Sequence, residues 1–179
     1  ICLISEEVAA KKMSLSQIAN YIADSVEKRA QNGMNFGVAI IPEGVVEFVP
    51  EFSSLIHEIN ELLAGSKADA FNALPNWKEK YAFIENGLTK ESMAVFEILP
   101  EGIQQQLFLE RDPHGNVQVS LIESEKLFSA LVKDVLDERK AAGTYKGKFG
   151  ALHHFFGYEG RCAFPSNFDA DYCYSLGYN

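Results

Sequence analysis

Two short segments carry side chains suited to holding an anionic ligand that also bears hydroxyl groups. The first is Pro42-Glu43-Gly44, and the second is Gly157-Tyr158-Glu159-Gly160-Arg161. The Arg161 guanidinium offers a planar fork of N–H donors that fits two phosphate oxygens and keeps its charge at any working pH. The Tyr158 hydroxyl can bind the same phosphate, and an ionised Glu43 can accept from two adjacent hydroxyls. This chemistry suits a phosphorylated sugar.

The same residues also fit a purely structural role. Pro-Glu-Gly is a common turn composition, and Arg161 could instead form an ion pair with Asp169 or Asp171. Gly44 and Gly160 would let a backbone approach a ligand closely, but glycine serves a tight turn equally well. Spacing alone leaves both interpretations open.

Other patterns for catalysis or metal binding are weaker. His153 and His154 are adjacent, so on a strand they point to opposite faces and cannot bind one metal together; a core or interface position fits them better. Cys162 follows a cation and could serve as a nucleophile, although a packed thiol is the simpler interpretation. Neither G-x-G-x-x-G nor G-x-x-x-x-G-K-[ST] occurs. We therefore predict no catalytic residue and no metal ligand in this chain.

Composition narrows the class of protein. The chain has 16 basic and 25 acidic residues and a formal charge of −9, which argues against a protein that binds DNA or RNA through the phosphate backbone. No apolar run approaches the roughly 20 residues that span a bilayer, so no membrane association is expected. The three cysteines, Cys2, Cys162 and Cys173, form no C-x-x-C pair and predict reduced, mostly buried thiols in a cytoplasmic protein.

The elements that must position the two segments alternate at the start of the chain. Residues 1–5 and 36–42 are continuous apolar runs, typical of parallel strands buried on both faces. Between them, Ser14 and Gln17 match a capping box, apolar residues recur at helical spacing, and Gly33 ends the predicted helix. A second helix is predicted from about Phe52 to Leu63, ended by Gly65. Strand, helix, strand, helix indicates a βαβ unit, in which ligands gather at the carboxyl ends of the strands.

The rest of the chain predicts an insertion and a return to the sheet. Residues 66–143 contain turn signals and short helical patterns, the last of them around Leu127 and Leu131. Residues 150–156 form an extended, aromatic-rich segment that leads into Gly157, and a final helix follows Pro165. We therefore expect an α/β fold with Rossmann-like βαβ layers, formed by 1–65 and 144–179, and a mostly helical insertion at 66–143.

The two ends of the chain suggest that it is a piece of a longer protein, because it opens without methionine in an apolar run and closes within an apparent helix. Several segments support this view and carry a resemblance. The chain resembles the long-form pyrophosphate-dependent 6-phosphofructokinases in Ile4-Ser5-Glu6-Glu7-Val8, in residues 35–50, and in 157–161 followed by Pro165-Ser166-Asn167-Phe168-Asp169. The resemblance spans essentially the whole chain, and the last of these blocks is the most specific.

The resemblance implies the phosphofructokinase fold and a role for each candidate residue. Glu43 would contact fructose 6-phosphate, while Tyr158, Glu159, Gly160 and Arg161 would stand where related enzymes grip the 6-phosphate. The family transfers a phosphoryl group reversibly from pyrophosphate to the 1-hydroxyl of the sugar, a step of glycolysis, with Mg²⁺. The resemblance also implies a homo-oligomer in the parent protein.

The chain lacks three motifs of that family: the Gly-Gly-Asp-Asp phosphate loop, the Thr-x-Asp segment with the catalytic Asp, and the Met-Gly-Arg sugar motif. These supply the base and hold the metal-bound donor, so pyrophosphate would be bound by the missing half and the chain alone is predicted to be inactive. A non-catalytic regulatory subunit or a sugar-phosphate sensor of the same fold is the alternative. An unrelated α/β interaction domain is a third possibility.

Overall fold

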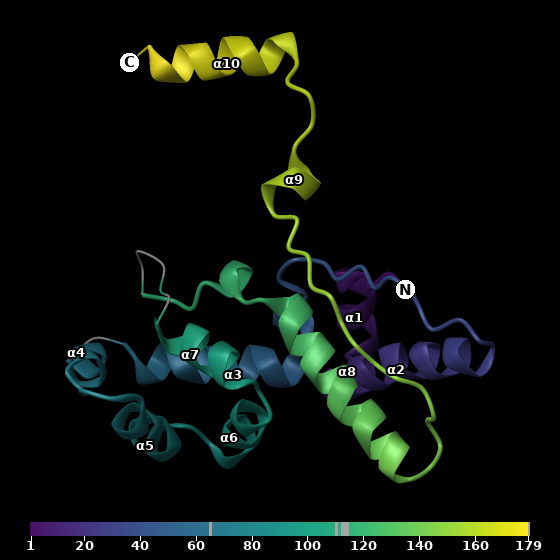
Figure 1. The fold of residues 1–179 in the computed structure, drawn as a ribbon. Helices are drawn as coiled ribbons and strands as arrows, with labels where there is room; N and C mark the ends of the chain where they lie inside the picture. The colour runs from purple at the N-terminus through teal and green to yellow at the C-terminus, as the bar shows by residue number, and fades with distance from the viewer. Residues whose placement is uncertain (65, 110, 112–114, 179) are drawn as a thin grey trace.

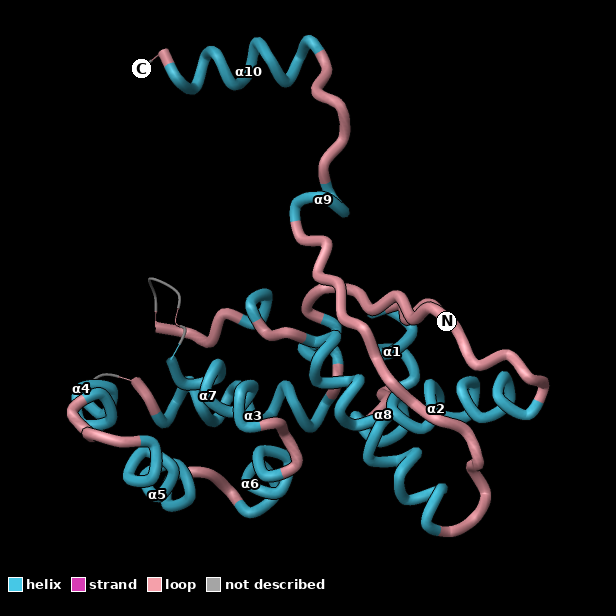
Figure 2. Tube along the Cα trace, in the orientation of Figure 1, coloured by secondary structure: helices cyan, strands magenta, loops and turns pink. Residues whose placement is uncertain are grey.

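The computed structural model describes residues 1–64, 66–109, 111 and 115–178. For Ser66, Leu109, Ser120, Tyr158 and Arg161 it describes the backbone but not the side chains. Within this part of the chain the protein is mostly helical, as Figures 1 and 2 show.

Helices follow one another along the described residues, joined by loops. Their bounds are α1 (Ser5–Lys11), α2 (Leu15–Gln31), the 3₁₀ helix η1 (Val45–Phe48), α3 (Pro50–Leu62), α4 (Ser66–Asn72), α5 (Trp77–Gly87), α6 (Lys90–Glu97), α7 (Glu101–Leu109), the 3₁₀ helix η2 (Val119–Leu121), α8 (Ser124–Ala141), α9 (Tyr158–Arg161) and α10 (Asn167–Gly177).

Helix α2 begins and ends where the sequence predicts. The Ser14 hydroxyl accepts from the Gln17 amide at 3.1 Å, and the Ser14 amide donates to the Gln17 side chain at 2.9 Å, which completes the capping box. Beyond the last helical residue, Gly33 has φ 73°, a left-handed conformation that glycine adopts without strain. The amide of Met34 then donates to the Arg29 carbonyl at 2.9 Å and closes the helix end.

Helix α3 is confirmed as well, although it begins at Pro50, two residues before the predicted start. Pro50 suits the first turn because a proline has no amide hydrogen to leave unpaired there. Four apolar residues on one face of α3 are buried: Phe52, Leu55, Ile59 and Leu62. Helix α3 ends at Leu62, one residue before the predicted Leu63, and the predicted stop signal at Gly65 lies outside the described residues.

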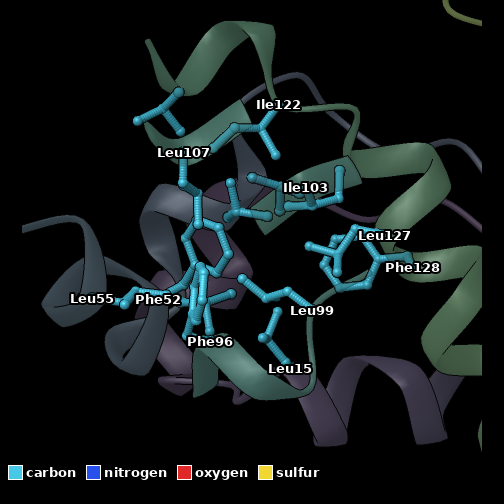
Figure 3. Close-up of a cluster of buried hydrophobic side chains, with 14 of the residues drawn as sticks. Leu15, Phe52, Leu55, Phe96, Leu99, Ile103, Leu107, Ile122, Leu127 and Phe128 are labelled. Atoms are coloured by element: carbon cyan, nitrogen blue, oxygen red, sulfur yellow. The ribbon is translucent and has the colours of Figure 1, made fainter. Parts of the chain in front are cut away.

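A single hydrophobic core joins α2 and α3 to helices within residues 66–143. Figure 3 shows Phe52 and Leu55 of α3 meeting Phe96 of α6, with Leu15 of α2 on the same cluster. The other labelled side chains come from the segments that follow: Leu99, Ile103, Leu107, Ile122, Leu127 and Phe128. The division of the chain at 66 and 143 stays a prediction, since the shared core neither requires nor excludes it.

An aromatic cluster holds the α4 to α7 part of this core. The Phe108 ring lies 5.6 Å from the Phe96 ring and 5.4 Å from the Phe71 ring, measured between ring centroids. Trp77 meets Phe108 edge-on, with centroids 6.5 Å apart at 67°. The edge-on arrangement of Phe96 and of Trp77 with Phe108 is a favoured geometry of aromatic pairs.

The predicted β-strands are wrong for the described residues. Residues 1–3 and 38–40 do lie side by side in parallel, but they form one isolated bridge, between Cys2 and Ile40. The Leu3 amide donates to the Ile40 carbonyl at 3.0 Å, and the Ile40 amide donates to the Ile1 carbonyl at 2.9 Å. The next residues already belong to α1. A buried parallel strand needs neighbours on both edges and cover on both faces, and within the described part of the chain these segments have only each other as backbone partners.

Most of the described residues from 150 onward are exposed. Residues 150–156, predicted as a strand, form a loop, with Leu152 92% and Phe155 64% exposed. Helices α9 and α10 stand clear of the helical body (Figure 1). Helix α10 itself is confirmed, and Ser166 and Asp169 form its capping box.

The predicted burial of the cysteine side chains is wrong. Cys2, Cys162 and Cys173 are all exposed rather than mostly buried, because the segments that carry them lie on the surface of this structure. Among the described helices, none combines the length and the apolar character needed to cross a membrane.

Candidate functional site

The turn that contains Glu43 is formed with the help of Gly44 and is followed directly by two residues of the hydrophobic core. The Val45 amide donates to the Pro42 carbonyl at 3.3 Å, and Gly44 has φ 71° and ψ 9°, as the third residue of a type II turn requires. Val45 and Val46 are fully buried directly after the turn. Glu43 is exposed, so the turn presents its carboxylate at the surface.

The segment that leads into this turn is held by a residue that the sequence reasoning did not single out. Arg29, in the last turn of α2, donates through Nε to the Phe36 carbonyl at 2.9 Å. Its guanidinium carbon also lies 5.3 Å from the centre of the Phe36 ring, within the range of a cation–π contact. Sequence pattern gives no signal for this contact, because it depends on how the chain turns back after Gly33.

The second candidate segment forms α9, a single helical turn. Gly157 has φ 50°, and the Glu159 amide donates to the Phe156 carbonyl at 2.9 Å. Glu159 and Gly160 are both exposed. The side chains of Tyr158 and Arg161 lie outside the described residues.

The structure therefore presents the two halves of the predicted site separately. Glu43 lies in a turn of the helical body, whereas α9 projects from that body (Figure 1). The convergence of Glu43 with Tyr158 and Arg161 on one ligand stays a prediction.

Two alternative interpretations can be weighed against described contacts. Asp169, considered as a partner for Arg161, accepts from the Ser166 hydroxyl and amide, each at 2.7 Å. The hydroxyl hydrogen bond, joined by the amide hydrogen bond, lowers the pKa of the Asp169 carboxyl.

His153 and His154 are exposed rather than in the core. Among the described residues, no group of three His, Cys, Asp or Glu side chains could hold a metal ion.

No family model matches this chain. Comparison with individual curated proteins does identify relatives. The chain is 52% identical over 178 residues to pyrophosphate--fructose 6-phosphate 1-phosphotransferase subunit beta 1 of Arabidopsis thaliana. It is 51% identical over 177 residues to the pyrophosphate--fructose 6-phosphate 1-phosphotransferases of Treponema pallidum (strain Nichols) and of Entamoeba histolytica.

Each of these matches covers 99% of this chain. The chain in turn spans only about a third of each relative: 30% of the Arabidopsis protein, 31% of the Treponema protein and 32% of the Entamoeba protein. About half of all positions are identical along essentially the whole chain, so the resemblance carried by the motifs is confirmed. The chain is a homologue of one segment of the pyrophosphate--fructose 6-phosphate 1-phosphotransferases.

Proposed function

We propose that this chain supplies the sugar-phosphate-binding portion of a pyrophosphate-dependent phosphofructokinase, which phosphorylates fructose 6-phosphate to fructose 1,6-bisphosphate. The observation that carries the proposal is the identity of about half of all positions with proteins of that name over 99% of the chain. The candidate residues fit the chemistry of this substrate, since fructose 6-phosphate has a dianionic phosphate at one end and hydroxyls along its length.

In the proposed complex each residue acts on a different part of the sugar. The Arg161 guanidinium and the Tyr158 hydroxyl donate to oxygens of the 6-phosphate, and the helical turn of Glu159 and Gly160 sets the spacing between them. The Glu43 carboxylate accepts from sugar hydroxyls. Gripping the sugar at both places leaves its 1-hydroxyl oriented toward the donor, and orientation supplies a large share of catalysis in phosphoryl transfer.

The remaining parts of the reaction belong to the part of the parent protein beyond this chain. Pyrophosphate binding and the catalytic base are assigned there, and Mg²⁺ would neutralise charge on the donor when bound. We assign no magnesium ligand to this chain, because the family motifs that hold the metal-bound donor are absent from its sequence. We further propose that the parent is a cytoplasmic homo-oligomer acting in glycolysis.

A segment exchange tests the proposal. The matching 31% of the Treponema pallidum relative is replaced by this chain, and formation of fructose 1,6-bisphosphate from pyrophosphate is followed. We expect the chimera to be active and the isolated 179-residue chain to be inactive. In the chimera, Arg161→Ala should raise KM for fructose 6-phosphate roughly tenfold to a hundredfold, because a charge-assisted contact is lost.

The control is Lys148→Ala, which removes the same charge from an exposed position before α9. It should leave KM unchanged. Equal effects of the two substitutions would reject the role of Arg161. A correctly folded chimera that binds fructose 6-phosphate without turning it over would instead support the non-catalytic sensor.

A further inference from the structure

We propose that Arg29 is a positioning residue for the Glu43 turn. From the end of α2 it fixes the extended segment 36–41, which leads directly into that turn. The inference rests on the proposed function, since positioning of Glu43 matters for the reaction only if this carboxylate contacts the sugar.

Three features of the Arg29 contact make it specific for the path of the segment. The guanidinium donates to the main-chain carbonyl of Phe36 at 2.9 Å and lies against the ring of the same residue. A side chain on the next residue, Gly37, would place its Cβ 3.4 Å from Arg29 Nε. That is an ordinary contact distance, so the Arg29 side chain passes directly beside the backbone of residues 36 and 37.

The segment has little else to hold it on this side of the turn. Phe36, Val38 and Ile40 are 75%, 75% and 61% exposed, so burial of apolar surface contributes little to their positions, and only at Ile41 does the segment pack against the core. Main-chain hydrogen bonds to residues 1–3 hold it at 38–40, and Arg29 holds it at Phe36. On the far side of the turn, by contrast, Val45 is fixed in the core.

Helix α2 is itself held in place, so it can act as a rigid support. Arg139 of α8 donates to Asn20, Asp24 and Glu27 of α2, at 2.9, 2.7 and 2.9 Å. These contacts tie α2 to α8, and Arg29 then ties α2 to the segment before Glu43. Polar contacts thus link α8 to α2 and α2 to Phe36, at the start of the segment that leads to the candidate sugar-binding turn.

The first test measures the hold on the segment and does not depend on catalysis. Amide hydrogen exchange of Ile40, which donates to the Ile1 carbonyl, is followed in the 179-residue chain. Arg29→Ala should speed this exchange about two- to tenfold, the effect of losing one hydrogen bond. Arg29→Lys keeps the cation and should restore part of the protection. The control Lys28→Ala, an exposed neighbour on the same helix, should leave exchange unchanged.

The second test uses the chimera with the Treponema pallidum relative. Arg29→Ala should raise KM for fructose 6-phosphate about two- to tenfold while KM for pyrophosphate and kcat stay near their starting values. Arg29→Lys should recover part of the lost affinity, and Lys28→Ala should have no effect. A merely structural residue would lower thermal stability and would alter both KM values alike.

The possible failures of the two proposals are distinguishable. A folded but inactive starting chimera would reject the proposed function, and the exchange of Ile40 would still decide whether Arg29 holds the segment. If the starting chimera is active and Arg29→Ala leaves both KM for fructose 6-phosphate and the exchange of Ile40 unchanged, the positioning role is overturned.

Discussion

Among single residues, Gly87 shows how closely two helices can meet when a side chain is missing. It is the last residue of α5, and a Cβ built on it would lie 2.8 Å from Cδ2 and 3.1 Å from Cγ of the buried Leu62. Gly87→Ala should therefore lower the free energy of unfolding by about 1–3 kcal/mol, because Leu62 must leave its position. Urea unfolding of the two proteins measures this difference.

Gly102 provides the matched control for this substitution. It lies in α7, and a Cβ there would meet nothing within 4 Å, so Gly102→Ala should be neutral or stabilise by about 0.5–1 kcal/mol through helix propensity. The steric explanation fails if Gly87→Ala is no more destabilising than Gly102→Ala.

Glu58 on α3 predicts a pH dependence. Partial burial by itself raises the pKa of the Glu58 carboxyl, but hydrogen bonds from the Thr89 amide, Ser92 and the Thr89 hydroxyl outweigh it, and the pKa is lowered from its ordinary 4.5. A carboxyl with a lowered folded-state pKa stabilises the fold above its unfolded-state pKa, and this contribution disappears as pH falls through the folded-state value. Glu58→Gln should thus cost about 0.5–1.5 kcal/mol at pH 7, and the difference from the unaltered protein should shrink below pH 4.5.

Urea unfolding at several pH values between 7 and 3 tests this prediction. Glu61→Gln is the control, since Glu61 lies on the same helix and pairs with His57 at the surface. A constant difference between the Glu58→Gln and unaltered proteins across the whole pH range would contradict the prediction.

At the scale of secondary-structure elements, Arg139 of α8 forms polar contacts with α2. Its guanidinium is about one-fifth exposed and donates to Glu27, which is similarly covered, and to the more exposed Asp24. Arg139→Ala should lower the free energy of unfolding by about 1–3 kcal/mol, because charge-assisted hydrogen bonds between two helices are lost. Lys140→Ala, at the exposed next position, should change it by less than about 0.5 kcal/mol.

A double-mutant cycle of Arg139→Ala with Glu27→Gln measures the interaction energy of this ion pair apart from the other contacts of the two residues. We expect a coupling energy of about 0.5–1.5 kcal/mol, reduced at high salt. Additive effects of the two substitutions would show that packing, and not the ion pair, holds α8 to α2.

The elements that the sequence predicted correctly are those specified by local signals. A capping box and helical spacing of apolar residues define α2, similar spacing defines α3, and a capping box of Ser166 and Asp169 begins α10. The segment 36–42 has the apolar character of a buried strand. A strand forms only where other segments pair with it, however, and the residues of one segment do not specify its partners. The parallel bridge between Cys2 and Ile40 joins two segments that the sequence predicted as strands of one βαβ unit.

At the scale of the whole molecule, the parts of the candidate site that depend on neighbouring residues could be predicted from the sequence, whereas contacts between distant residues could not. The turn at Glu43 could be predicted because its own residues favour it, and Gly44 adopts the left-handed conformation such a turn needs. The contact of Arg29 with Phe36 could not, since it joins residues whose proximity depends on the return of the chain after α2. The apolar residues from Leu152 onward were predicted as part of a strand, but they are exposed in the structure, and strand pattern alone could not predict this exposure.

The edge-on packing of Trp77 against Phe108 has a spectroscopic consequence. Trp77 is the single tryptophan of the chain, whereas Tyr172, Tyr174 and Tyr178 all lie in or beside the exposed α10. Indole emission will accordingly report on the α5–α7 neighbourhood alone, and tyrosine signals are needed to follow the C-terminal helix. Tyr21, Tyr81 and Tyr145 belong to the helical body, so the tyrosine signal becomes a reporter of the projecting end once these three are replaced by phenylalanine.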